Sequence, residues 1–214
     1  AQFLSSDIFR IISEVAFEEH LRCFVIGGYV RDCFLGRESN DIDVVVEGSG
    51  IALAQALGKR LGKSVSVFKN FGTSMLRYKG IELEFVGARN ESYSHDSRKP
   101  FVENGTLEDD QLRRDFTINA MAFSLCKENF GELVDPFGGI KDLSKGIIRT
   151  PADPDITYSD DPLRMIRAIR FSCKLTTIDK RFEICKESKA SIWRNRERLS
   201  ILSRERIVEE MNKI

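Results

Sequence analysis

The sequence of 214 residues predicts an α+β protein, with a mixed α/β part over residues 1–150 and an all-helical part over residues 151–214. In the first part, amphipathic helix patterns alternate with short apolar runs that are typical of strands. After residue 159 only helical periodicity remains, and Pro151 and Pro154 precede this change as structure breakers. A chain of this length can form one large domain or two small ones, and we expect two.

The first five elements follow from apolar spacing. Periodicity predicts a helix over residues 5–21. The apolar run at 23–26 ends at two glycines, which predicts a strand that breaks into a turn, followed by a short helix over residues 29–34. A β-branched run at 42–46 predicts a buried strand, and residues 51–61 predict a helix that ends at a glycine.

Three strand patterns follow, over residues 64–67, 73–78 and 81–85. Lys79 and Gly80 separate the last two strands and predict a hairpin turn.

The next stretch is less regular. Residues 89–104 are polar, without periodicity, and predict a long loop. Residues 120–125 and 132–134 predict a further pair of strands. Asp161 and the proline after it predict the start of a helix in the second part.

Composition excludes several classes of protein. The chain is 42% hydrophobic and 31% charged, as ordinary soluble globular proteins are. No apolar run approaches the roughly 20 residues of a membrane-spanning helix, and no N-terminal signal pattern occurs, so we expect a cytoplasmic protein. Five cysteines, an odd number without a CxxC pair, argue against a disulfide framework or a zinc site.

Charge is unevenly distributed along the chain. The net charge of zero argues against a simple basic nucleic-acid clamp. Residues 160–214 nevertheless contain 14 Lys and Arg against 9 Asp and Glu, a net charge of +5, and the preceding residues carry the opposite excess. This distribution suits metal binding next to nucleic-acid contact, although solvated helix faces explain the basic part equally well.

The most informative stretch begins at the two glycines. Gly27 and Gly28 follow a predicted strand, so the backbone there can approach a bulky anion, and the next helix offers N–H groups to phosphate oxygens. Arg31 can add a charged hydrogen bond. This pattern predicts a phosphate-binding turn.

Two aspartates follow on the next predicted strand. Asp41 and Asp43 flank one apolar residue, so both carboxylates point to the same face, with about 6–7 Å between their Cα atoms. Two carboxylates on one face form a good Mg²⁺ site. A third acid would come from a neighbouring strand, where Glu82 and Glu84 are alternatives. A glycine turn or an Asp-x-Asp pair alone is a weak signal, but the combination is specific.

Five ordered motifs resemble those of one family. They are residues 27–32 with 41–43; residues 113–120, Arg-Arg-Asp-Phe-Thr-Ile-Asn-Ala; residues 135–139, Asp-Pro-Phe-Gly-Gly; residues 161–164, Asp-Pro-Leu-Arg, with Arg167 and Phe171; and residues 203–207 with Glu210. The set resembles the class II branch of the polymerase-β superfamily, which contains bacterial-type tRNA CCA-adding enzymes and poly(A) polymerases. The resemblance implies a polymerase-β-type nucleotidyltransferase head with a mixed or antiparallel sheet, followed by a helical neck.

The resemblance also implies a role for each matching residue. Gly27 and Gly28 would hold the triphosphate, and Asp41 and Asp43 would hold the metal ions. Glu84 is preferred as the third acid, because it lies five residues before Arg89 as in the family. The other residues implied in nucleotide binding are Arg31, Arg114, Asp115, Asn119, Asp161, Arg164 and Arg167.

Base selection by Asp161 and Arg164 makes physical sense. Arginine only donates hydrogen bonds, and a carboxylate only accepts them. Cytosine and adenine each present an amino donor beside a ring acceptor, whereas uracil and guanine present the opposite arrangement. This pair can therefore select CTP and ATP without a template. One departure is that Asp160 stands where the family has Glu.

The implied function is addition of CCA to tRNA from CTP and ATP with Mg²⁺. Poly(A) polymerase is the nearest alternative, but residues 71–74, Phe-Gly-Thr-Ser, resemble the CCA type instead of the basic poly(A) pattern. Split CC-adding or A-adding enzymes remain open. A small-molecule nucleotidyltransferase should lack the Asp161–Arg164 helix. A non-catalytic RNA-binding module is disfavoured by two retained aspartates, since close like charges destabilise a fold that does not use them.

Two expectations concern the rest of the molecule. Family members continue with further helical domains that grip the tRNA, so we expect this chain to be part of a longer enzyme that binds nucleotide but holds tRNA poorly. We expect Tyr158, Phe171 and Trp193 to lie in the core and not to act as base-stacking platforms.

Overall fold

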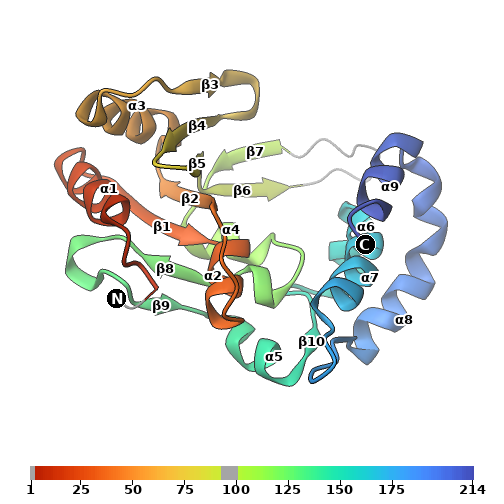
Figure 1. Ribbon diagram of the computed structural model, residues 1–214. Coiled ribbons are helices and arrows are strands. Elements are labelled where there is room, and N and C mark those ends of the chain that lie inside the picture. Colours follow the sequence, from red (N-terminus) through yellow and green to blue (C-terminus); the bar gives the residue numbers. More distant parts are fainter. Residues whose placement is uncertain (1–2, 93–100) are drawn as a thin grey trace. The chain divides into compact units, whose positions relative to one another are not determined.

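The structure, a computed structural model, describes residues 3–92 and 101–214. It divides into two compact units whose segments alternate along the chain (Figure 1). Unit 1 comprises Ala1–Asn90, Val102–Gln111 and Met121–Pro136, and unit 2 comprises Glu91–Phe101, Leu112–Ala120 and Phe137–Ile214. The expected division into a catalytic part and a helical part near residue 150 stays a prediction about functional domains.

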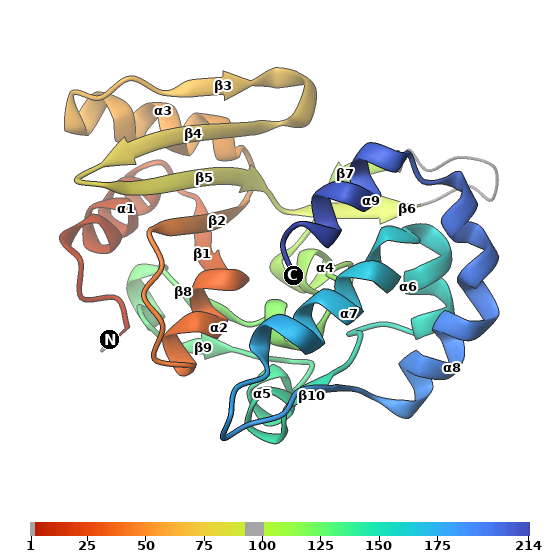
Figure 2. The ribbon, with the colours of Figure 1, turned by 45° about the vertical axis from the view of Figure 1, so that its right-hand side comes forward.

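Unit 1 is built on a seven-stranded mixed sheet, which confirms the predicted sheet type. Its strands are β1 (Arg22–Ile26), β2 (Asp41–Glu47), β3 (Ser66–Phe68), β4 (Thr73–Tyr78), β5 (Ile81–Gly87), β8 (Ala122–Ser124) and β9 (Leu133–Val134). Their order is β3-β4-β5-β2-β1-β8-β9. Only β2 and β5 pair in parallel, and every other pair is antiparallel. The parallel pair places two strands from distant parts of the sequence side by side (Figure 2).

The strands of this sheet have two different faces. On one face Ile42, Leu76 and Leu83 are buried, and α3 (Gly50–Leu61) covers this face, since a Cβ on Gly58 would lie 3.7 Å from Leu76. Helix α1 (Asp7–Glu18) packs against α3 and β1.

The opposite face is apolar over part of its length. Its core cluster consists of Phe24, Ile26, Val45, Ala88, Leu107 and Ala122. Helix α4 (Leu107–Leu112), which the sequence pattern did not predict, contributes Leu107. Beyond this cluster the same face of β2 carries polar side chains, because Asp41 and Asp43 alternate in register with Val45.

Local turn chemistry explains how the strands are joined. Lys79 and Gly80 both have positive φ angles, 47° and 83°, as a two-residue hairpin turn between β4 and β5 requires. The short helix α2 (Gly28–Phe34) follows β1 directly, as predicted. The single-turn helices η1 (Lys69–Phe71) and η3 (Lys127–Asn129) complete unit 1.

The expected loop over residues 89–104 is partly wrong, because its two ends are strands. Strands β6 (Arg89–Ser92) and β7 (Phe101–Asn104) form a two-stranded sheet. Alternation was too weak over four residues to signal a strand. Residues 93–100 lie outside the described part of the chain.

Unit 2 is mainly helical, as predicted for the second part of the sequence. Its elements are η2 (Thr117–Asn119), α5 (Gly139–Lys145), β10 (Ile147–Ile148), α6 (Pro154–Asp160), α7 (Leu163–Leu175), β11 (Glu183–Ile184), α8 (Lys186–Asn195), η4 (Arg196–Ile201) and α9 (Arg204–Met211). The two short strands β10 and β11 pair in parallel, which the expectation of helices alone did not include. No helix among the described residues is long and apolar enough to cross a membrane.

The three aromatic residues expected in the core differ in outcome. Tyr158 is fully buried and Phe171 is 6% exposed, which confirms the prediction for both. Phe171 packs edge-on against Phe116, with ring centroids 5.7 Å apart. Trp193 is 69% exposed, so the prediction for this residue is wrong. It lies on the outer face of α8, near the end of the helix.

Candidate active site

Four carboxylates lie together on one face of the unit 1 sheet. Asp41 and Asp43 flank buried Ile42 on β2. The parallel register of β2 and β5 places Asp41 beside Glu82 and Asp43 beside Glu84. Side chains at paired positions of neighbouring strands point to the same face. The predicted carboxylate pair and both candidate third acids are therefore neighbours.

The two candidate third acids have different partners. Glu82 accepts hydrogen bonds from the Arg77 guanidinium, with 2.8 Å between Nε and Oε2. The pKa of Glu84 is raised above its usual value, first because the side chain is partly buried and then because Asp43 and Asp41 lie nearby, while Arg89 acts in the opposite direction. The charge of Glu82 is thus offset by a cation, whereas Glu84 adds to the negative field of the aspartates.

This arrangement fits a metal ion that is also bound by its substrate. Among residues 3–92 and 101–214, no group of three or more His, Cys, Asp or Glu side chains is placed closely enough to hold a metal ion alone. Mg²⁺ is commonly held by one or two carboxylates plus phosphate oxygens and water. Asp41 and Asp43 satisfy that requirement. They add to the rise in the pKa of Glu84 that burial causes first, and a bound cation would oppose their contribution.

The glycine turn begins beside Asp43. In the antiparallel pairing of β1 with β2, Ile26 is the partner of Asp43, and Gly27 follows Ile26 directly. Gly27 has φ of 83° and ψ of −130°, a backbone conformation that is strongly disfavoured for residues other than glycine. The turn then enters α2 at Gly28. The sheet register thus brings the predicted phosphate-binding turn and the carboxylates to one edge.

Arg31 lies in the last turn of α2 and already has an acidic neighbour. Its guanidinium donates to both carboxylate oxygens of Asp32, at 2.9 Å and 3.0 Å, and the Arg31 side chain is only 11% exposed. A phosphate contact by Arg31 would add to this ion pair.

In unit 2, Asp115 ties the motif at residues 113–120 to helix α7. Its carboxylate accepts from the Asn119 side-chain amide at 3.0 Å and from the Arg167 guanidinium at 2.8 Å and 2.6 Å. Burial acts to raise the pKa of Asp115, but Arg167 and Asn119 outweigh it and hold that pKa below its usual value. Three predicted residues from two distant motifs thus form one buried network.

The remaining predicted residues of unit 2 surround this network. Arg164 donates from Nη2 to the carbonyl oxygen of Arg113 at 2.7 Å, and Asp161 accepts from the backbone N–H of Leu163 at 3.2 Å at the start of α7. Arg114 donates to the carbonyl of Asn119 at 3.5 Å, a long contact.

Glu210 belongs to one of the recognised motifs, but its sequence pattern predicts no role for it. Its carboxylate is 5% exposed and lies 2.6 Å from the Nε of Arg170 and 3.5 Å from Arg167. The 2.6 Å contact lacks hydrogen-bond geometry, so we describe it as an ion pair. Glu210 thus joins α9 to the charged face of α7. A glutamate at the end of a polar helix gives no sign of this burial in the sequence.

The twelve predicted site residues are divided equally between the units. Gly27, Gly28, Arg31, Asp41, Asp43 and Glu84 belong to unit 1, and Arg114, Asp115, Asn119, Asp161, Arg164 and Arg167 belong to unit 2. Within each unit the structure brings the residues into neighbouring positions. Their roles in catalysis and nucleotide binding stay predictions.

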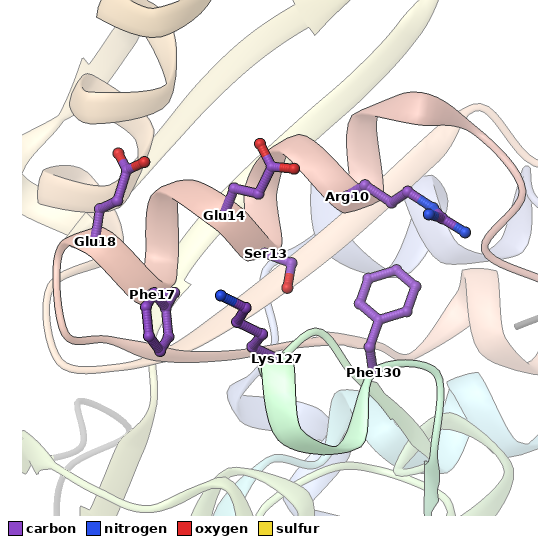
Figure 3. Close-up of a pocket in the computed structure, with 7 residues that line it drawn as sticks. All are labelled: Arg10, Ser13, Glu14, Phe17, Glu18, Lys127 and Phe130. Carbon is purple, nitrogen blue, oxygen red and sulfur yellow. The ribbon is translucent and has the colours of Figure 1, made fainter.

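A separate cleft lies between α1 and η3 in unit 1 (Figure 3). It has a volume of about 520 Å³, and its walls include Phe17, Phe130, Arg10 and Lys127. The ammonium of Lys127 lies 4.3 Å from the centroid of the Phe17 ring. None of the predicted site residues lines this cleft.

Two family models match the chain. Residues 23–149 match the poly A polymerase head domain, and residues 181–214 match a region described as the probable RNA and SrmB-binding site of polymerase A. The first match includes the glycine turn, the carboxylates and the motif at residues 113–120.

Individual relatives agree with the family match. An A-adding tRNA nucleotidyltransferase of Aquifex aeolicus is 46% identical over 155 residues, which is 72% of this chain and 19% of the relative. A CCA-adding enzyme of Lactobacillus helveticus is 35% identical over 211 residues, which is 97% of this chain and 48% of the relative.

A solved structure shares the fold. It is a tRNA nucleotidyltransferase in complex with a primer tRNA and an incoming ATP analogue, with a TM-score of 0.81 and 36% identity over 94% of this chain and 55% of that one. The chain therefore spans about half the length, or less, of the relatives it matches.

Proposed function

We propose a function for this chain from one premise: it belongs to the family of the poly A polymerase head domain. The proposal is that it carries the catalytic part of a template-independent nucleotidyltransferase that adds CCA to the 3′ end of tRNA, using CTP and ATP and releasing pyrophosphate. The observation that carries the proposal is the row of Asp41, Asp43 and Glu84 beside the Gly27 turn.

The choice of tRNA as the acceptor has support from the relatives. The two similar proteins are named for A addition and CCA addition to tRNA, and the similar solved structure contains a primer tRNA with an ATP analogue. The match of residues 181–214 to a probable RNA-binding region agrees with this choice. A cytoplasmic location is part of the same proposal.

The reaction joins the RNA 3′-hydroxyl to the α-phosphorus of the nucleotide. The bond from the α-phosphorus to the bridging oxygen breaks, pyrophosphate leaves, and the hydroxyl loses its proton. Family members generally use a divalent metal ion, and we propose Mg²⁺ held by Asp41 and Asp43 with help from Glu84. When bound, such ions lower the pKa of the attacking hydroxyl and stabilise the leaving oxygen.

The chain itself binds and orients the nucleotide. The Gly27 turn lets the backbone approach the triphosphate, because a side chain there would be both strained and in the way. Arg31, Arg114 and Asn119 supply donors to phosphate and ribose oxygens.

Base selection is assigned to the start of α7 and to Asp161, which directly precedes it. Asp161 and Arg164 face the base edges of CTP and ATP, while Asp115 and Arg167 hold the helix and the motif at 113–120 in a fixed relation. In this proposal residues 1–150 form the catalytic domain and residues 151–214 form the nucleobase-recognition domain.

A second candidate function is addition of A alone. The relative that is 46% identical is named for A addition, whereas the CCA-adding relative is 35% identical. The carboxylate row, by which we mean Asp41, Asp43 and Glu84, would serve either reaction equally. Both reactions join a hydroxyl to an α-phosphorus.

Incorporation of single nucleotides distinguishes these functions. We would incubate the chain with Mg²⁺, one labelled nucleoside triphosphate at a time, and tRNA transcripts that end before CCA, after C or after CC. The transcripts are supplied at concentrations high enough to offset the weak tRNA binding that we expect of this chain. The expected result is that CTP alone adds two C to the first transcript and one C to the second, and that ATP alone adds one A to the transcript ending in CC. Addition of A only to the transcript ending in CC would establish the second candidate, and long A tails would establish poly(A) synthesis. Failure to incorporate any nucleotide by a folded chain that binds CTP would contradict the proposal.

A further inference from the structure

The outer face of α8 carries an exposed tryptophan among cations. This side of α8 carries Lys186, Lys189 and Trp193, at intervals of three and four residues. Arg196 follows three residues later, directly after the helix ends, and its helical backbone conformation keeps it on the same side. All four are exposed, and Trp193 is 69% exposed. We call these four residues the basic stripe.

The opposite side of α8 holds the helix against the rest of unit 2. Ser188 and Ser191 are buried, and the Ser191 hydroxyl donates to Asp155 of α6 at 2.6 Å. Arg194 and Asn195 also donate to Asp155. The orientation of α8 on α6 is therefore fixed by contacts in which the basic stripe takes no part.

The indole ring of Trp193 is held in position by Arg196. The guanidinium of Arg196 lies 4.3 Å from the centroid of the indole ring and donates from Nη1 to the carbonyl of Trp193 at 2.6 Å. A cation on one face of an indole fixes the ring without covering both faces. Among the described residues, Glu197 lies 3.7 Å from the Arg196 guanidinium, and Glu187 lies next to Lys186 in the sequence.

We propose that the basic stripe binds single-stranded RNA, with an unpaired base stacked on Trp193 and the flanking phosphates on Lys186, Lys189 and Arg196. Aromatic side chains interleaved with cations are the usual means of holding unpaired nucleotides. Burial of the stripe against an apolar protein surface would be unfavourable, because it would desolvate three cations that have at most one ion pair between them among the described residues, the 3.7 Å contact of Arg196 with Glu197. Phosphate groups provide anionic partners.

The inference deepens the proposed function and rests on it for the choice of RNA as the partner. It goes beyond the match of residues 181–214 to a probable RNA-binding region, because it assigns one helix face and one stacking residue.

The single tryptophan of the chain makes a direct test possible. We would titrate the chain with a 3′-deoxy-terminated oligoadenylate and follow the Trp193 emission, and separately measure Kd by anisotropy of the labelled RNA. Inorganic polyphosphate serves as a polyanion without bases. The expected result is that RNA quenches the emission and polyphosphate leaves it unchanged, because only a base can stack on the indole.

Variants separate stacking from charge. Trp193→Ala should weaken RNA binding by about tenfold, and Trp193→Phe should recover part of that loss. Lys189→Ala should lower the slope of log K against log salt by about 0.7. Lys59→Ala is the matched control, because Lys59 lies on α3 of unit 1 and outside the basic stripe. It should change neither the Kd for RNA nor the salt slope.

The outcome is independent of catalysis. RNA binding that is absent, or that leaves the emission and the Trp193→Ala Kd unchanged, overturns the inference even if the chain transfers nucleotides normally. Quenching by RNA with the expected loss in Trp193→Ala supports the inference even if no nucleotide is incorporated, in which case only the proposed function fails.

Discussion

At the scale of single residues, the two glutamates beside Asp41 and Asp43 have different partners. Glu82 and Glu84 lie two positions apart on β5, on the same face, but only Glu82 is paired with Arg77. Replacement of Glu84 by Gln should lower the rate of nucleotide transfer about a hundredfold or more, because it removes a charge next to Asp43 that helps to hold the metal.

Glu82→Gln is the matched control for this prediction. It should retain most of the activity, since Arg77 already offsets that charge on an exposed part of the sheet. Initial rates at saturating CTP and Mg²⁺ check both variants. Equal losses in the two variants would show that Glu84 is not the third acid.

Asp115 gives a second prediction, which concerns stability against pH. Its pKa is lower in the folded state than in the unfolded state, so its contribution is present above the unfolded pKa and is lost as pH falls through the folded one. The free energy of unfolding should therefore fall from about pH 5 downwards. Urea unfolding followed by circular dichroism, from neutral pH to pH 3, measures this.

Asp115→Asn is the variant that tests the assignment. It should be about 3 kcal/mol less stable than the wild type at neutral pH, because it leaves Arg167 without its main partner. It should also lose less stability on acidification. An acid dependence identical to that of the wild type would exclude Asp115 as its source.

At the scale of elements, helix α3 is held very close to the sheet at its first residue. A Cβ on Gly50 would lie 2.8 Å from backbone atoms of Val86 on β5, which cannot move aside as a side chain can. Gly50→Ala should therefore destabilise the chain by about 1–3 kcal/mol through overpacking.

Gly28→Ala serves as the comparison, because a Cβ there meets only Arg31 at an ordinary 3.7 Å. Its effect on stability should stay within about 0.5 kcal/mol. Thermal unfolding of the two variants side by side checks the prediction. A destabilisation of Gly28→Ala as large as that of Gly50→Ala would contradict this account of the packing.

The elements also show why some of the fold could be predicted and some could not. Strand β2 and helix α3 followed from long apolar patterns, and the Lys79–Gly80 turn from residue chemistry. Helix α4 and strand β6 are short and polar, so their structure depends on contacts that no local pattern records.

At the scale of the whole molecule, the sequence motifs and the three-dimensional units are organised differently. The motif at residues 113–120 lies far from α7 in sequence, yet buried Asp115 forms an ion pair with the partly buried Arg167. Spacing along the chain cannot reveal such a pair, although each residue could be selected by its motif. Trp193 shows the reverse case, because its large apolar side chain suggests a core position but lies exposed.

The strand register of the unit 1 sheet is also a long-range feature that spacing along the chain does not reveal. The sequence indicates two strands with acidic residues, but it does not show that β2 and β5 pair in parallel with Asp43 beside Glu84. That pairing arises from the packing of α3 and of the apolar cluster on the two sheet faces. It is the feature on which the proposed catalytic role depends.

The most direct test of the central claim is the rate of nucleotide transfer to an RNA 3′ end by Asp43→Asn, compared with Asp7→Asn. Asp7 is an exposed aspartate paired with Lys79, so it matches the chemical change outside the carboxylate row. We predict that Asp43→Asn remains folded by circular dichroism and loses transfer entirely, while Asp7→Asn transfers at the wild-type rate. Transfer at the wild-type rate by folded Asp43→Asn would contradict the assignment of the carboxylate row as the catalytic centre.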